Sequence, residues 1–336
     1  MAGAPHGPDV DVPDLAQRIL AGDRQALARG ITLVESVAPA HRVAASALLD
    51  LLTPHAGKAQ RVAVSGVPGA GKSSFIETLG VQLCEAGQRI AVLTIDPSSP
   101  VSGGSILGDK TRMARLSRHP SAFIRPSPSS GELGGVRRST RETMTLCEAA
   151  GFGVVLVETV GVGQSEVTVR EMVDCFLVLM IAGAGDELQG IKKGIIELAD
   201  VLVVNKADGE NLARAEATRM EFAQALHYLA AAEGTWQPPV LTCSAATGAG
   251  VAETWTAVQN FFAHAQGSGA WADRRRAQAL AWLHSLVEHE LREQFWSHPA
   301  VQAARAGMEE AVVAGKISAS AAAQQLLWTA QAARAK

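Results

Sequence analysis

RVAVSGVPGAGKSS, at residues 61–74, decides the fold of this 336-residue chain. A short β-branched run leads into a glycine, and the residues that follow complete the spacing G-x-x-x-x-G-K-S. In such a loop, glycines let backbone N–H groups surround an anion, the lysine reaches the β- and γ-phosphates, and the serine ligates Mg²⁺. The helix expected next points its positive end at the phosphates. The stretch therefore predicts a P-loop that binds a nucleoside triphosphate through Gly66, Gly69, Ala70, Gly71, Lys72, Ser73 and Ser74.

The composition is that of a globular protein. Hydrophobic residues make up 47% of the chain and charged residues 19%, and the formal net charge of −3 gives no reason to expect nucleic acid or an anionic membrane as a partner. No apolar run approaches the ~20 residues that span a bilayer, and residues 1–14 lack the features of a signal peptide. We therefore expect a cytoplasmic protein. Its four cysteines show no C-x-x-C pattern, which predicts reduced, buried thiols.

Short apolar runs alternate with longer amphipathic stretches after the P-loop. Most of the runs are continuously apolar, as in strands that are buried on both faces of a parallel sheet. This alternation predicts an α/β P-loop domain with a mostly parallel, doubly wound sheet, and functional residues at the carboxyl ends of its strands. The expected strands lie at residues 62–65, 90–95, 122–124, 154–157, 176–181, 201–204 and 240–242, and the main helices at 132–150, 211–231 and 251–264.

Helices are expected on both sides of this domain. Before it, Asp23 is a predicted N-cap and Pro39 opens a further helix. After it, a helix carries an apolar stripe, while the arginines at residues 274–276 are expected to form a solvated face, and Ser318 caps the last helix. The stripe consists of Leu280, Leu283, Val287, Leu291 and Phe295.

Acidic residues follow two of the predicted strands. Asp96 ends the second strand, Asp109 comes thirteen residues later, and Glu158 ends the fourth strand, three residues before Gly161. Mg²⁺ prefers hard oxygen ligands, so these three carboxylates and Ser73 are candidate metal ligands, directly or through water. In P-loop domains an acidic residue and a γ-phosphate-sensing glycine occur at this place. For Asp109 the alternative of a helix N-cap stays open.

Asn205-Lys206-Ala207-Asp208, after the sixth strand, matches the N-K-x-D pattern of guanine recognition. The aspartate carboxylate accepts hydrogen bonds from guanine N1–H and N2–H₂, groups that adenine lacks, so the wrong base leaves buried polar groups unpaired. Ser244-Ala245-Ala246, after the seventh strand, fits the remaining guanine loop. The alternative is that Asp208 caps the next helix. We expect GTP or GDP as the bound nucleotide.

Six blocks of sequence between residues 66 and 208 carry a resemblance that covers nearly the whole chain: GVPGAGKSS, DPSSPVSGGSILGDKTRM, SSGELGGVRRSTRE, ETVGVGQSE, GAGDELQGIKKGI and NKAD. On these blocks the chain resembles the MeaB/ArgK family, GTPases that chaperone adenosylcobalamin-dependent acyl-CoA mutases and that include the human methylmalonic aciduria type A protein. The resemblance implies that Lys72 and Ser73 hold phosphate and magnesium. It also implies that Asp96, Asp109 and Glu158 complete the metal shell, and that Asn205, Lys206 and Asp208 read guanine.

The resemblance implies three mobile segments, at residues 96–113, 158–166 and 183–194. The third is linked to activation of hydrolysis by the mutase, and its Gln189 and Lys192 are candidates for contacts that form when a partner docks. In Ras-type GTPases a glutamine after the glycine orients the attacking water, whereas Val162 follows Gly161 here. We therefore expect slow hydrolysis by the isolated protein, stimulation by the mutase, and the catalytic residues Lys72, Glu158, Gln189 and Lys192.

The domain organisation expected from the residues and the resemblance has three parts. Residues 1–56 form an N-terminal helical segment, residues 57–266 the P-loop GTPase domain, and residues 267–336 a helical arm that builds a homodimer. A P-loop kinase acting on a small molecule or transport protein is the alternative, disfavoured because no carboxylate is left for an acceptor's base. A nickel-insertion GTPase is disfavoured by the lack of a His/Cys tract.

Overall fold

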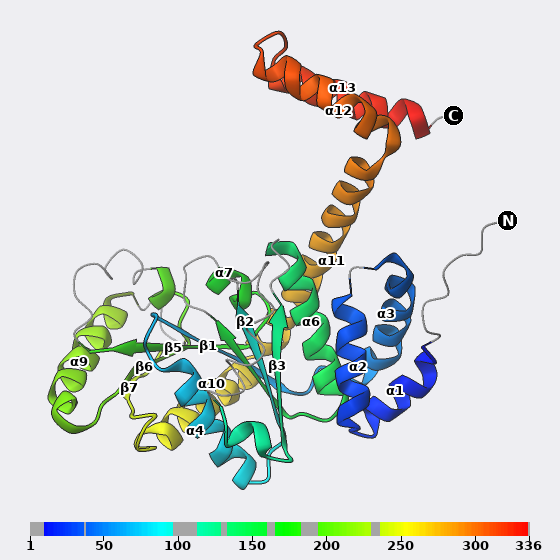
Figure 1. Cartoon of the computed structure of the whole chain (residues 1–336). Helices are drawn as coiled ribbons and strands as arrows, with labels where there is room; N and C mark the ends of the chain where they lie inside the picture. The colour runs from blue at the N-terminus through cyan, green and yellow to red at the C-terminus, as the bar shows by residue number, and fades with distance from the viewer. Residues whose placement is uncertain are drawn as a thin grey trace. The chain divides into compact units, whose positions relative to one another are not determined.

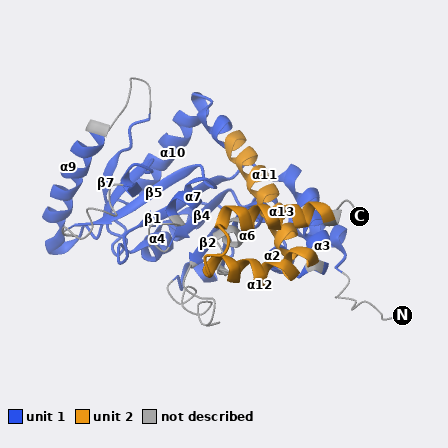
Figure 2. Cartoon of the chain, turned by 90° about the horizontal axis from the view of Figure 1, so that it is seen from above, with its two compact units in different colours: residues 1–274 blue, residues 275–336 orange. Residues whose placement is uncertain are grey.

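The computed structural model describes residues 10–36, 38–96, 113–128, 133–159, 165–182, 194–229 and 236–334. The chain forms two compact units, Met1–Arg274 and Arg275–Lys336 (Figure 2). Among the residues in these ranges, no helix combines the length and the hydropathy that a membrane span requires.

A seven-stranded sheet lies at the centre of the first unit (Figure 1). All its paired strands are parallel, and their spatial order is β3-β2-β4-β1-β5-β6-β7. The seven predicted strands and the doubly wound α/β fold are thus confirmed. The strands are β1 (Gln60–Gly66), β2 (Ile90–Asp96), β3 (Ala122–Pro128), β4 (Val154–Thr159), β5 (Cys175–Ile181), β6 (Val201–Asn205) and β7 (Val240–Thr242).

Helices cover both faces of this sheet, which explains why its central strands are continuously apolar. Helix α4 (Lys72–Glu85) and helix α10 (Val251–Gly267) pack against each other on one face, as Figure 1 shows. Helix α6 (Leu133–Ala149) and the short helix α7 (Ser165–Arg170) contact each other on the opposite face, and α9 (Leu212–Leu229) packs on β6 and β7. All four cysteines are buried and free, as predicted.

Three N-terminal helices share the hydrophobic core of the sheet. They are α1 (Val12–Leu20), α2 (Arg24–Glu35) and α3 (Pro39–Leu52), followed by a 3₁₀ turn, η1 (Thr53–His55). Asp23 accepts hydrogen bonds from the backbone N–H groups of Gln25 (2.8 Å) and Ala26 (3.1 Å), so the predicted N-cap is confirmed. Because these helices pack against α6, they form one continuous core with the nucleotide-binding fold.

The last three helices are α11 (Ala270–Ser297), α12 (Pro299–Val313) and α13 (Ala319–Arg334). Ser318 accepts a hydrogen bond from the N–H of Ala321 (3.2 Å), which confirms it as the N-cap of α13. The predicted solvated face at residues 274–276 is wrong for Arg274. Its guanidinium donates to the carbonyl of Asp174 and lies 3.5 Å from the carboxylate of Asp200 in the first unit.

Candidate nucleotide site

The P-loop connects β1 to α4 and approaches its neighbours closely at Gly66 and Gly71. Gly66 has φ +142°, and a Cβ there would lie 2.0 Å from the carbonyl oxygen of Leu179 on β5. Gly71 has φ +84° directly before α4, and a Cβ there would lie 2.8 Å from Nδ2 of Asn205. Both positions combine a positive φ with a close approach, which only glycine tolerates. The loop is therefore fixed against β5 and against the end of β6.

Lys72 and Ser73 begin α4, as the motif predicts. The ammonium of Lys72 donates to the carbonyl oxygens of Gly66 (2.9 Å) and Val67 (3.3 Å), which places it inside the P-loop. Burial lowers the pKa of Lys72, and the nearby carboxylates of Glu158 and Glu166 partly offset this effect. The ammonium thus lies where the loop would surround the phosphates of a nucleotide.

Glu158 lies beside the P-loop at the carboxyl end of β4. One of its oxygens accepts a hydrogen bond from Ser73 Oγ (2.7 Å), and in the sheet the residue pairs with Val64 of β1 and Thr94 of β2. A hydroxyl and a carboxylate in contact form an all-oxygen donor set, which fits Mg²⁺. Asp96, two residues beyond Thr94, ends β2 at this same edge, although the position of its side chain is not described.

Glu166 is a second buried carboxylate near Lys72, and sequence reasoning missed it. The residue lies on α7 and is 1% exposed, and it lies close enough to Lys72 to offset part of the lowering of the lysine pKa by burial. Its sequence signal is weak, because it stands eight residues beyond Glu158 and matches no metal or phosphate motif. The site thus holds one buried ammonium and two buried carboxylates.

Asn205 connects the loops that are predicted to read guanine to the P-loop. Its Nδ2 donates to the carbonyl oxygen of Ala70 (2.7 Å), and its Oδ1 accepts from the N–H of Ala245 (3.0 Å) and from Cys243 Sγ (3.3 Å). Burial raises the pKa of the Cys243 thiol to about 12, so this thiol stays protonated as a donor. Thr78 Oγ1 on α4 donates to the carbonyl oxygen of Ala245 (2.7 Å). These bonds bring three predicted loops into one site.

Asp208 faces the loop after β7. Its carboxylate accepts a hydrogen bond from the hydroxyl of Ser244, a fully buried residue, and makes no capping bond to the 3₁₀ turn η4 (Gly209–Asn211) that follows. The alternative of a helix cap at Asp208 is therefore wrong. Lys206 has a φ of 61°, a left-handed conformation that non-glycine residues rarely adopt and that often marks a functional loop. Lys206 and Ala246 are both exposed beside this carboxylate.

Four of the predicted site residues lie outside the described residues. They are Asp109, Gly161, Gln189 and Lys192. Their assigned roles remain predictions, as does the position of the Asp96 side chain.

A parallel α/β sheet with a P-loop after β1 and an N-K-x-D sequence after β6 defines the class of this protein as a P-loop GTPase. A model of the family described as "Methylmalonyl Co-A mutase-associated GTPase MeaB" matches residues 27–300. The chain belongs to the MeaB family.

Relatives from distant organisms match most of the chain. A protein named "Probable GTPase" in Mycobacterium tuberculosis is 53% identical over 97% of both chains. GTPase ArgK of Escherichia coli is 51% identical over 82% of this chain and 83% of its own length. The mouse protein "Methylmalonic aciduria type A homolog, mitochondrial" is 44% identical over 92% of this chain and 77% of its own. Among solved structures, one described as "LAO/AO transport system kinase" matches with a TM-score of 0.75 and 38% identity, covering 97% of this chain and 99% of that chain.

The interaction of Ser244 with Asp208 predicts a switch in base preference. We expect Asp208→Asn to weaken GTP binding by about 10²-fold or more, because the amide cannot accept both guanine hydrogens, and to favour xanthosine triphosphate, whose C2 carbonyl needs a donor. Titration calorimetry with both nucleotides measures the change. Glu210→Gln, two residues away and exposed, is the control for the lost charge. Equal GTP affinity in the wild type and Asp208→Asn contradicts the guanine assignment.

Proposed function

We propose that this protein is a GTP-hydrolysing chaperone of an adenosylcobalamin-dependent acyl-CoA mutase such as methylmalonyl-CoA mutase. In this role it gates the loading, exchange and protection of the cobalamin cofactor. The observation that carries the proposal is the Asn205 side chain, which joins a P-loop to the loops that are predicted to read guanine in a member of the MeaB family. The family description and the name of the mouse relative support the mutase as the partner.

The charges of the site favour a nucleotide that arrives with a metal ion. Lys72 contributes one positive charge, whereas Glu158 and Glu166 contribute two negative charges in a region with little water to screen them. A triphosphate would be repelled by these carboxylates alone. Ser73 and Glu158 would hold Mg²⁺ through their side-chain oxygens, and the ion would supply positive charge next to the phosphates.

The chain's own residues then account for a slow basal reaction. Lys72 positions the phosphates, and Asn205 and Asp208 hold the base, so the substrate is oriented. The residue after Gly161 is Val162, whose aliphatic side chain cannot orient water. Isolated protein should therefore hydrolyse GTP at or below the ~10⁻² s⁻¹ of unassisted GTPases that carry their own arginine.

The segment at residues 183–194 is the proposed activating element. It follows β5 closely, and β5 pairs with β1 so that Leu179 lies opposite Gly66 of the P-loop. The strand that precedes the segment therefore runs beside the start of the P-loop. We propose that a docked mutase brings Gln189 or Lys192 to the γ-phosphate or its water, where either side chain stabilises the transition state.

This mechanism predicts that the mutase accelerates hydrolysis through that segment. Phosphate release is measured with and without a cognate mutase for the wild type, Gln189→Ala and Lys192→Ala. We expect acceleration of the wild type and loss of most of it, by about tenfold or more, in at least one variant, because preorganised donors supply large terms in catalysis. Glu197→Ala, an exposed change just beyond the segment, is the control. Acceleration of both variants equal to that of the wild type excludes the mechanism, and a wild type that no mutase accelerates contradicts the proposed function.

A kinase activity has less support. Glu166 is a carboxylate that the sequence argument against a kinase did not count, but at 1% exposure it is closed to an acceptor substrate. The same assay separates the two functions, because a GTPase releases one inorganic phosphate for each GDP formed, whereas a kinase keeps the phosphate on its acceptor.

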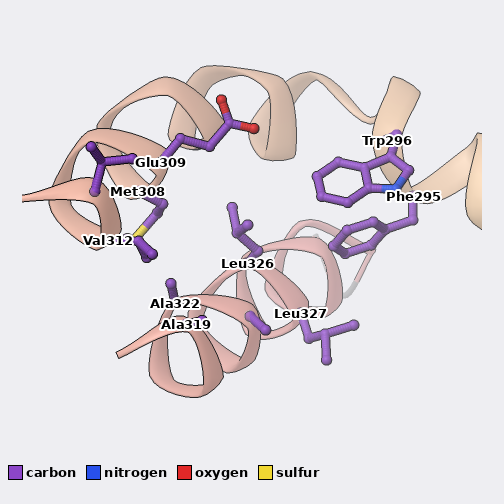
Figure 3. A pocket seen from close by; sticks show the side chains of 11 residues that line it. Phe295, Trp296, Met308, Glu309, Val312, Ala319, Ala322, Leu326 and Leu327 are labelled. Carbon is purple, nitrogen blue, oxygen red and sulfur yellow. The ribbon is translucent and has the colours of Figure 1, made fainter. Parts of the chain in front are cut away.

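The second unit carries apolar surface that fits a second copy of the chain. On α11, Leu280, Leu283, Val287 and Leu291 are each between 49% and 54% exposed, along the predicted stripe. Figure 3 shows the side chains around an apolar hollow of about 450 Å³, which is bounded by residues of α11, α12 and α13 such as Phe295, Met308, Val312 and Leu326. Contiguous apolar surface of this kind is typical of protein interfaces. We propose that it builds the homodimer implied by the family resemblance.

The dimer proposal predicts that charges in the stripe separate the copies. Light scattering of the wild type should give twice the 35.1 kDa chain mass, and Leu283→Asp combined with Val287→Asp should give the single mass, because buried unpaired charges are strongly unfavourable. Met220→Asp introduces the same charge at a 60% exposed apolar residue of α9 and should leave the dimer intact. A monomeric wild type at tens of micromolar, about the concentration at which specific dimers form, contradicts the proposal.

A further inference from the structure

Asp200 forms the centre of a cluster of charges at the edge of the sheet opposite the P-loop. It directly precedes β6, and its carboxylate is 8% exposed. Arg170 binds it through both η nitrogens, Nη2 to Oδ1 at 2.9 Å and Nη1 to Oδ2 at 2.5 Å. Arg274 lies on the same side, with Nη1 3.5 Å from Oδ2. Two arginines therefore share one buried carboxylate.

These two arginines belong to helices with different roles. Arg170 is the last residue of α7, the helix that also carries Glu166 near Lys72. This helix follows Glu158 and the predicted γ-phosphate sensor Gly161 in the chain. Arg274 lies in the first turns of α11, the helix that continues into the second unit. The carboxylate of Asp200 thus joins the helix beside the phosphate site to the base of the C-terminal helices.

Asp200, the acceptor, is held in place by further hydrogen bonds, whereas Arg170 and Arg274, the donors, lie near helix ends. Asp200 Oδ2 accepts the N–H of Phe176 (2.8 Å), and its carbonyl oxygen accepts Trp236 Nε1 (2.7 Å), so two further elements hold the residue. Both arginines also reach the carbonyl oxygen of Asp174. The two arginines share the carboxylate of Asp200 and the carbonyl oxygen of Asp174, and other bonds hold Asp200 in place. A shift of one guanidinium therefore changes how the other can contact these acceptors. If one guanidinium moves away, the other arginine becomes the main partner of this buried carboxylate, so the position of one arginine affects the other.

We propose that Asp200 is a positioning residue that couples α7 to the first turns of α11, so that GTP hydrolysis and the state of the C-terminal unit influence each other. The inference rests on the proposed function, because it takes the bound γ-phosphate as the event that shifts α7. Coupling of this kind is reciprocal in binding free energy. Anything that holds α11, including a second copy on its apolar stripe, therefore changes the affinity for GTP relative to GDP.

The test compares Arg274→Met and Asp200→Asn with the wild type in the full-length protein. Arg219→Met is the matched control, because Arg219 is also in an ion pair, with Glu216 at 2.6 Å, and its side chain is 32% exposed against 31% for Arg274. Amide hydrogen exchange of peptides that cover residues 270–276 is measured with GDP and with a non-hydrolysable GTP analogue. Steady-state hydrolysis gives kcat and KM for each variant, and thermal melts show whether each variant is folded.

In the wild type and Arg219→Met, exchange at residues 270–276 should differ about threefold or more between the two nucleotides, and the difference should vanish in Arg274→Met and Asp200→Asn. The same two variants should change kcat about threefold or more, whereas Arg219→Met should leave kcat unchanged. Equal exchange with both nucleotides in the wild type overturns the coupling. An unchanged difference in exchange between the two nucleotides in Arg274→Met also overturns it. The Arg274→Met variant keeps the test decisive if Asp200→Asn fails to fold. Either result leaves GTP binding and mutase stimulation intact, so it is distinct from a failure of the proposed function.

Discussion

One side-chain amide holds the nucleotide site together. Asn205 donates to the P-loop at Ala70 and accepts from Ala245 and Cys243 in the loop after β7. It is 1% exposed, so these hydrogen bonds form where water does not compete and where an unpaired amide would be costly. The phosphate side and the base side of the site come from elements more than 130 residues apart in the chain. Together with the bond from Thr78 to Ala245, this amide fixes the separation of the two halves, which a nucleotide requires.

The sheet determines which residues the amide can connect. In a parallel sheet all carboxyl ends lie at one edge, so β1, β4 and β6 deliver the P-loop, Glu158 and Asn205 to the same region. The opposite edge holds the Asp200 cluster, where α7 and α11 meet one carboxylate. The short helix α7 carries Glu166 near Lys72 and ends at Arg170, and so links the two edges. Site chemistry and the proposed coupling thus depend on the same strand order.

Features that depend on local spacing or on continuous hydrophobicity could be predicted from the sequence. All seven strands followed from apolar runs, and Lys72, Ser73, Glu158 and Asn205 followed from motifs at strand ends. The predictions that were missing or wrong concern residues whose roles depend on contacts between distant segments. Glu166 belongs to the site because α7 packs near Lys72. Arg274 is not part of a solvated face because it contacts Asp174 and Asp200. No periodicity in the chain records such pairings.

The loops joined by Asn205 are proposed to select guanine, and competition between nucleotides for the wild-type protein measures this selectivity. A fluorescent GDP analogue is bound to the protein with Mg²⁺ and displaced by GTP or by ATP. Because adenine leaves the Asp208 carboxylate and its partner Ser244 without the guanine donors, the account predicts that displacement by ATP needs a roughly 10⁴-fold higher concentration than displacement by GTP. Displacement by the two nucleotides at similar concentrations would contradict it.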